Sequence, residues 1–147
     1  MHKTYKIVRK PFHLLGFIAA IALGWLAYEQ YQLYQYRRVA KAISGLDASK
    51  ATFVISKSEW ATGGPGSYHA FVFQFPAFDE ATFINKCNQI ARHAIAFGAI
   101  EDSSGWAIEP ELMPPPPRCG LSRRTDTTSS ETATLGRDGR LYIEYSN

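Results

Sequence analysis

An uncharged apolar stretch near the N-terminus limits what this chain can fold into more than any other feature. Residues 11–28, PFHLLGFIAAIALGWLAY, contain no charged side chain and lie between Lys10 and Glu29. As a helix they would extend about 27 Å, which is enough to cross the hydrocarbon core of a bilayer. The sequence therefore predicts a transmembrane helix over 11–28. Membrane lipid is accordingly the first partner that we expect.

The charges on the two sides of this stretch predict its orientation. Residues 1–10 carry four basic side chains and no acidic one, whereas the three basic residues that follow lie nine or more positions beyond the apolar stretch. Basic residues favour the cytoplasmic side of a membrane. We therefore expect a single-pass protein with a basic cytoplasmic N-terminus, 1–10, and an extracytoplasmic C-terminal domain. In the inner membrane of a bacterium that side is the periplasm.

Aromatic side chains gather at the far end of the predicted helix. Trp25, Tyr28, Tyr31 and Tyr34 follow one another at helical spacing. Such rings are typical of the boundary between lipid and water. No Gly or Pro occurs between Tyr28 and Gly45, so the sequence predicts that the helix continues over 29–44 as an amphipathic stalk.

The apolar stretch has two other interpretations. A cleaved signal peptide would explain the basic start, and Ala22 and Gly24 offer a site with small residues. Cleavage there would leave a new terminus rich in Trp and Tyr. A buried helix of a soluble protein would not need four basic residues in front of it. A permanent anchor is the favoured interpretation.

The charge of the remaining chain argues against nucleic-acid binding. From Ser44 onward there are nine Lys or Arg and twelve Asp or Glu residues, which gives this part a net charge of −3. A protein that binds nucleic acid needs basic residues clustered on the binding domain. The high isoelectric point comes instead from the flanks of the apolar stretch.

The domain after the stalk, 45–147, combines strand and helix patterns. Residues 51–56 and 68–75 are rich in β-branched and aromatic residues and predict two strands. In the second strand the aromatic side chains of Phe71, Phe73 and Phe75 share one face. We expect that face to lie in the core.

The clearest helix signal begins at Asp79, a favourable N-cap residue. Phe78 before it and Phe83 within it can form a hydrophobic staple. Apolar residues then recur at helical spacing, and Gly98 can end the helix. The sequence predicts that this helix covers the phenylalanine face of the preceding strand, and that its apolar stripe includes Phe83, Cys87, Ile90, Ala94 and Phe97, widened by Ile84, Ala91 and Ile95.

The C-terminal part predicts a hairpin after an irregular segment. Residues 101–118 contain the proline run 114–117, which favours polyproline II and either docks in an aromatic groove or spaces two elements. Residues 129–146 alternate around a turn at 137–139. The expected fold is thus α+β: a transmembrane helix extended as a stalk, then a small antiparallel sheet packed by one long helix in the order β-β-α-β-β.

Two cysteines occur, Cys87 on the predicted helix and Cys119 after the prolines. In an oxidising compartment a disulfide between them would attach the irregular segment to the helix. The alternative is two free thiols, one of them buried. The extracytoplasmic orientation favours the disulfide.

No motif predicts a catalytic residue, a metal site or a cofactor. Cys87 and His93 are six residues apart on one helix and point in different directions, and His69 has no second ligand nearby in sequence. Glu109 and Glu111 resemble paired carboxylates only in spacing. The glycine loop at 62–67 lacks the Lys and Ser/Thr of a phosphate loop. No small-molecule substrate is evident either.

Loops on a rigid scaffold often bind partners, and aromatic residues often anchor such contacts. The candidates for partner binding are Trp60, Gly63, Gly64, Tyr68 and Trp106, the alternative being that the two tryptophans pack internally.

The sequence thus predicts a non-enzymatic protein-binding module. An immunity protein that inhibits an envelope-acting toxin matches the size, the anchor and the acidic domain. The alternative is a structural subunit of an envelope assembly, such as a secretion or pilus-type machine, built on the small residues Gly16, Ala19, Ala20 and Gly24.

Overall fold

The computed structural model describes residues 9–60, 67–76, 78–96, 100–101, 109–124 and 129–146, with only the backbone described for residues 9–13, 59–60 and 100–101. The chain divides into two compact units, Met1–Gln35 and Tyr36–Asn147, and each is described by itself.

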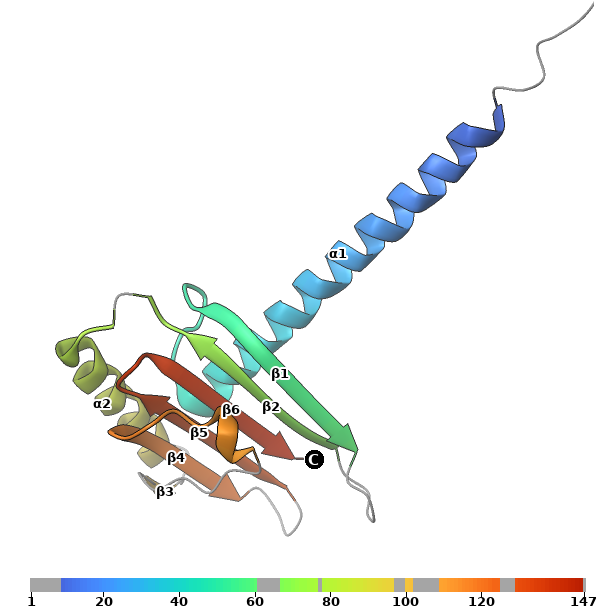
Figure 1. The fold of residues 1–147 in the computed structure, drawn as a ribbon. Helices are drawn as coiled ribbons and strands as arrows, with labels where there is room; N and C mark the ends of the chain where they lie inside the picture. Colours follow the sequence, from blue (N-terminus) through green and yellow to red (C-terminus); the bar gives the residue numbers. More distant parts are fainter. Residues whose placement is uncertain are drawn as a thin grey trace, which may run out of the picture. The chain divides into compact units, whose positions relative to one another are not determined.

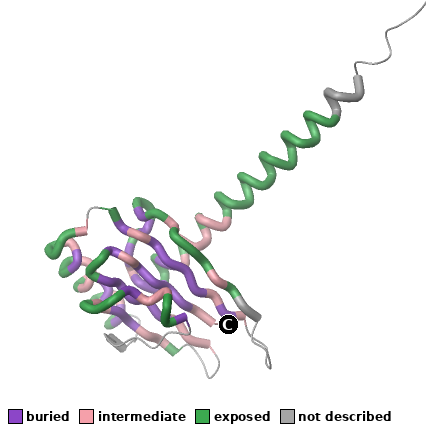
Figure 2. The backbone as a smooth tube through the Cα atoms, in the orientation of Figure 1, coloured by how far each residue is buried: buried purple, intermediate pink, exposed green. Residues whose placement is uncertain are grey.

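The first unit contains most of one long helix, α1 (Arg9–Ser44). From Leu14 to Tyr31 its apolar side chains are exposed, as the green tube in Figure 2 shows. Among the described residues, α1 is long and apolar enough to cross a membrane. This confirms the helix predicted from the uncharged stretch.

The second unit is an α+β domain built on a six-stranded antiparallel sheet, which confirms the predicted fold class. In sheet order the strands are β1 (Thr52–Trp60), β2 (Ser67–Gln74), β6 (Arg140–Ser146), β5 (Ser130–Gly136), β4 (Arg118–Arg124) and β3 (Ile100–Glu101). Figure 1 shows the end of α1 and the helix α2 (Glu80–Ala96) behind this sheet.

The end of α1, from Tyr36 to Ser44, contributes to the core of this domain. Ala40 and Ile43 are buried, and the Tyr36 ring lies 4.9 Å from the Phe71 ring between centroids. Gly45 ends the helix with a positive φ of 75°, and its amide donates to the carbonyl of Lys41 at 2.9 Å. A Cβ at Gly45 would lie 2.7 Å from the His93 ring, so this position requires glycine.

Rows of paired residues across the strands define the face that carries the helices. One row runs from Phe53 through Phe73, Leu141 and Leu135 to Cys119. Directly paired residues point to the same face of an antiparallel sheet, so α2, bonded to Cys119, lies on the phenylalanine side. The prediction that α2 covers this face is therefore correct for the half around β4. The end of α1 covers the other half.

The N-terminus of α2 forms as predicted. The amide of Thr82 donates to Asp79 Oδ1 at 2.8 Å, and the Phe78 and Phe83 rings lie 6.3 Å apart. The predicted stripe was wrong in two places, because Ile84 and Ile95 are 51% and 81% exposed. These residues point away from the sheet, which only one side of the helix can contact. Phe97 and Gly98 lie outside the described residues.

The opposite face of the sheet is covered by the segment 109–117. Its short helix η1 (Pro110–Leu112) lies in front of the strands in Figure 1. Leu112 and Met113 pack against the buried cluster of Tyr68, Ala70, Val72 and Tyr142. The domain therefore has three layers: helices, sheet and this segment.

The domain contains more strands than the predicted β-β-α-β-β order. The hairpin of β5 and β6 forms as expected, with its turn at Arg137, Asp138 and Gly139, the last at a φ of 84°. β4 and the two-residue β3 were not predicted. β1 is also longer than expected, because it continues past the predicted end at residue 56 and runs through Trp60.

Candidate functional site

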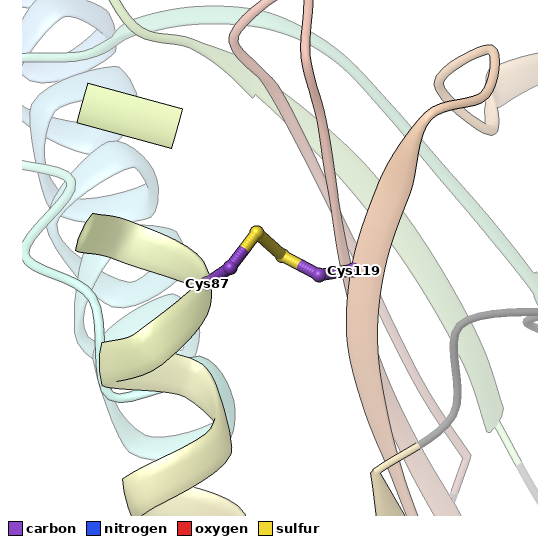
Figure 3. Close-up of a disulfide and its surroundings, with 2 residues drawn as sticks. All are labelled: Cys87 and Cys119. Atoms are coloured by element: carbon purple, nitrogen blue, oxygen red, sulfur yellow. A yellow bond between two sulfur atoms is a disulfide. The ribbon is translucent and has the colours of Figure 1, made fainter. Parts of the chain in front are cut away.

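The predicted disulfide is present. Cys87 of α2 and Cys119 of β4 are bonded, with 5.8 Å between their Cα atoms and 32 residues between them in sequence. Figure 3 shows the bond crossing from the helix to the strand. It closes a loop that contains β3, η1 and the proline run, so it restricts the unfolded chain over these 32 residues.

A cluster of charges joins β1 to the segment that covers the sheet. Lys57 Nζ lies 2.7 Å from Glu109 Oε2 and 2.6 Å from Glu111 Oε1. Glu109 is almost buried, whereas the Glu111 side chain is 64% exposed. One positive charge thus faces two negative ones, so the cluster carries a net charge of −1, and its solvent-facing member is Glu111.

A second polar group lies beneath the same segment. The Tyr142 hydroxyl donates to Glu144 Oε2, and both side chains are buried. Burial, and then the hydrogen bond to Glu144, raises the pKa of Tyr142. Burial also raises the pKa of Tyr68, to about 12. Both phenols are therefore neutral at physiological pH, which favours a structural role for this group.

The covering segment is held at its far end as well. Pro114 is buried, and Arg118 Nη1 donates to its carbonyl at 3.3 Å. The amide of Arg137 donates to the carbonyl of Pro117 at 3.0 Å. Of the two interpretations of the proline run, spacing and docking, the structure shows a run that is packed against its own domain at Pro114.

Glu109 and Glu111, which resemble paired carboxylates only in spacing, are brought together on a lysine. The hydrogen bond from Lys57 is the largest cause that lowers the pKa of Glu111. Its bonds to Glu109 and Glu111 raise the pKa of Lys57 in turn. A general acid or base needs a pKa near the working pH, and here both shifts lead away from neutrality. The arrangement acts as a clamp between two elements.

The two histidines of the domain, His69 and His93, occupy separate places. The His69 ring stacks on the Tyr145 ring at 4.9 Å, and His93 Nε2 lies 2.9 Å from the carbonyl oxygen of Ala42. Within the described part of the chain, no three His, Cys, Asp or Glu side chains are placed to bind a metal ion.

The predicted partner-binding residues fall largely outside what the structure describes. Gly63, Gly64 and Trp106 lie outside the described residues, as does the side chain of Trp60 at the end of β1. Tyr68 is buried in the cluster below Leu112 and Met113, so its side chain faces the covering segment. The role of the other four residues stays a prediction.

The strand β1 offers an exposed surface that the sequence did not single out. It forms one edge of the sheet, whereas the other edge is the two-residue β3. Val54 and Ile55 of β1 are 54% and 39% exposed, and the pairing with β2 shifts between Phe53 and Ile55. In Figure 2 the exposed part of β1 contrasts with the neighbouring strand β2, most of which is buried.

The predicted membrane-interface residues lie on the exposed part of α1. The side chains of Trp25, Tyr28, Tyr31 and Tyr34 are all more than half exposed. Trp25 Nε1 donates to Glu29 Oε1 at 2.7 Å, one helical turn on. This bond joins an amphipathic ring to the first charge after the apolar stretch, as expected where a helix leaves the lipid.

Comparisons with protein-family models, with curated proteins and with solved structures found no match to this chain.

Proposed function

We propose that this chain is a single-pass membrane-anchored protein whose α+β domain faces the extracytoplasmic side, in a bacterium the periplasm, and binds another protein there without catalysing a reaction. The observation that carries the proposal is the Cys87–Cys119 disulfide in a chain that also has an exposed apolar helix. Structural disulfides persist in oxidising compartments. An N-terminal helix with basic residues before it places a following domain in such a compartment.

The titratable groups of the described part support binding as the task. Lys57 forms an ion pair with Glu111, and the Tyr142 hydroxyl donates a hydrogen bond to Glu144. These groups stabilise the covering segment and the sheet. The pKa shifts of Lys57, Glu111 and Tyr142 lead away from neutrality, which does not suit proton transfer at physiological pH.

Within this class we favour an immunity protein that inhibits an envelope-acting toxin. Such an inhibitor needs a small stable domain held where the toxin arrives, and a complementary charge speeds the encounter with a basic partner. The domain from Ser44 onward has a net charge of −3. The disulfide and the clamp at Lys57 give it the rigidity that lowers the cost of binding.

A competition between cells tests this function. In the native host the gene is deleted, and the deletion strain is grown in contact with its parent. We expect the parent to eliminate it, because its own toxin is no longer neutralised. A version of residues 36–147 exported to the periplasm at high level should restore survival, since an inhibitor needs only its domain. Equal growth of the two strains would contradict the proposal.

The alternative, a structural subunit of an envelope assembly, is favoured by one observation on α1. Apart from its own stretch of helix backbone, no described part of the chain lies within 4 Å of a Cβ added at Gly16 or Gly24, so this helix side is open to close approach by another helix. In that case the exported domain should fail to replace the full chain. Ala20→Leu in the full chain should fail as well, whereas an inhibitor should tolerate this substitution.

A further inference from the structure

The outer edge of β1 is the longest free strand edge in the described part of the sheet. β1 pairs with β2 over eight of its nine residues, and no described strand pairs with its other side. An edge strand presents unpaired amide and carbonyl groups along its length. Their natural complement is the backbone of another extended chain.

The exposure along β1 agrees with an uncovered edge. Thr52, Val54, Ile55, Ser56 and Ser58 are all exposed, whereas most of the neighbouring β2 is buried. Three of these five side chains are β-branched, the type that packs well beside a further strand. The edge therefore offers side-chain contacts in addition to backbone hydrogen bonds.

The charge beside this edge indicates the chemistry of the partner. Lys57 of β1 is ion-paired with both Glu109 and Glu111, so this cluster keeps a net charge of −1, and Glu111 is its exposed acidic member. Opposite charges on neighbouring strands attract, and like charges repel. A partner strand with a basic residue at this position would complete the pairing.

The same charge argues against a second copy of this chain. Two β1 edges joined about a twofold axis would place two clusters of charge −1 on the same face of a continuous sheet. This repulsion would oppose the dimer. The bulge between Phe53 and Ile55 would also have to be matched by its copy.

We infer that the outer edge of β1 binds an extended segment of another protein as an added strand, with a basic side chain of that segment beside Glu111. The inference rests on the proposed function and names its surface and the chemistry of the partner. Recognition of this kind takes its affinity from the main chain and its specificity from alternate side chains.

A peptide selection on the intact protein tests the inference. The full-length chain in lipid nanodiscs is offered a random library of peptides of about twelve residues, long enough to cover the nine residues of β1. Empty nanodiscs remove lipid binders. We expect the selected peptides to alternate β-branched residues, to lack proline within the binding stretch and to contain Lys or Arg.

Two readouts on the best selected peptide decide the outcome. Amide hydrogen exchange should slow in residues 52–60 when the peptide binds. Two N-methylated forms of the peptide are compared, one methylated at the odd positions and one at the even positions. The form that has lost the amide donors facing β1 should bind roughly ten-fold or more weakly, and the other form should be affected much less. Slowed exchange confined to α2, or equal weakening of both forms, would overturn strand addition.

A pair of variants tests the charge. Glu111→Gln should weaken binding of the basic peptide about three-fold, in line with an exposed cross-strand pair. Glu80→Gln, which removes the same charge from the start of α2, should leave binding unchanged. Equal effects of the two substitutions on peptide binding would contradict the role of Glu111. A dimer of the chain in which the amides of β1 are already protected from exchange would show that a second copy is the occupant.

The selection and the competition assay fail independently. If the deletion strain is eliminated and rescued as expected but β1 stays unprotected by selected peptides, the site is wrong and the proposed function stands. If β1 binds peptides as described but the deletion strain grows normally, the edge is a binding site and the inhibitor function is wrong.

Discussion

The Tyr36 ring of α1 stacks on the Phe53 ring of β1, with 5.3 Å between centroids and an interplanar angle of 4°. Two residues earlier on the same helix, Tyr34 is 61% exposed. The change from exposed to packed aromatic residues marks where the helix enters the domain. The compact unit accordingly begins at Tyr36, within the stretch 29–44 that the sequence suggested as a stalk.

Tyr36→Ala should therefore destabilise the domain, because it removes contacts with both Phe53 and Phe71. We expect the free energy of unfolding to fall by about 2 kcal/mol, since Tyr36 is only partly buried. Tyr34→Ala is the matched control and should change it by less than about 0.5 kcal/mol. Denaturant unfolding of the detergent-solubilised chain measures both. Equal effects would show that Tyr36 does not belong to the core.

Removal of the disulfide should weaken the same domain. The variant Cys87→Ala with Cys119→Ala frees α2 from β4, and the loop-entropy argument gives a loss of about 2–4 kcal/mol in the free energy of unfolding. Reduction of the wild type should have a similar effect. Thermal unfolding with and without reductant measures this loss. A wild type that unfolds at the same temperature under both conditions would contradict it.

Acid should weaken the clamp at Lys57. The pKa of Glu111 is lowered from its ordinary 4.5, mainly by the hydrogen bond from Lys57, so the ionised form is favoured in the folded state. This contribution to stability is present above about pH 4.5 and is lost as the pH falls through the lowered pKa. The raised pKa of Lys57 keeps that side chain charged throughout the acid range.

Unfolding temperatures measured between pH 7 and pH 3 test this dependence. Glu111→Gln should reduce the acid-induced fall in stability, and Lys57→Met should do the same because it removes the cause of the shift. Lys50→Met, which changes an exposed lysine before β1, is the control and should keep the wild-type profile. If all four proteins lose stability in parallel, the clamp contributes nothing that depends on Glu111.

The buried pair of Tyr142 and Glu144 makes a further prediction. Tyr142→Phe removes a hydroxyl that donates to a buried carboxyl group, and we expect a loss of about 1–2 kcal/mol in the free energy of unfolding. Tyr145→Phe, on the half-buried opposite face of β6, should cost less than about 0.5 kcal/mol. Combined with Glu144→Gln, Tyr142→Phe should cost less than the sum of the two single changes. Strict additivity would show that the two residues are not coupled.

Local signals accounted for the elements that the sequence predicted correctly. Asp79 with Phe78 and Phe83 defined the start of α2, and the turn residues at 137–139 defined the final hairpin. The distribution of charge around the apolar stretch favours an oxidising compartment for the domain, where a disulfide between Cys87 and Cys119 is expected. Each of these predictions depended on residues close together in sequence or on bulk composition.

The features that escaped prediction depend on distant pairing. β4, with the sequence RCGLSRR, has weak alternation and becomes a strand because β5 and β3 pair with it. Lys57 meets Glu109 across 52 residues, a contact that no local pattern indicates. Ile84 and Ile95 belong to the apolar stripe of α2 by spacing alone. Only the packed structure shows which part of that stripe the sheet can reach.

The central claim is that an anchored domain with an intact disulfide lies outside the cytoplasm. Membranes that contain the full-length chain are treated from the outer side with a protease and with a thiol-reactive probe, and the mass of the chain is determined. We predict an uncleaved N-terminus, digestion of the domain from the outer side and no thiol labelling until a reductant is added. A protected domain with two reactive thiols, or a mature chain that has lost residues 1–24, would contradict the claim.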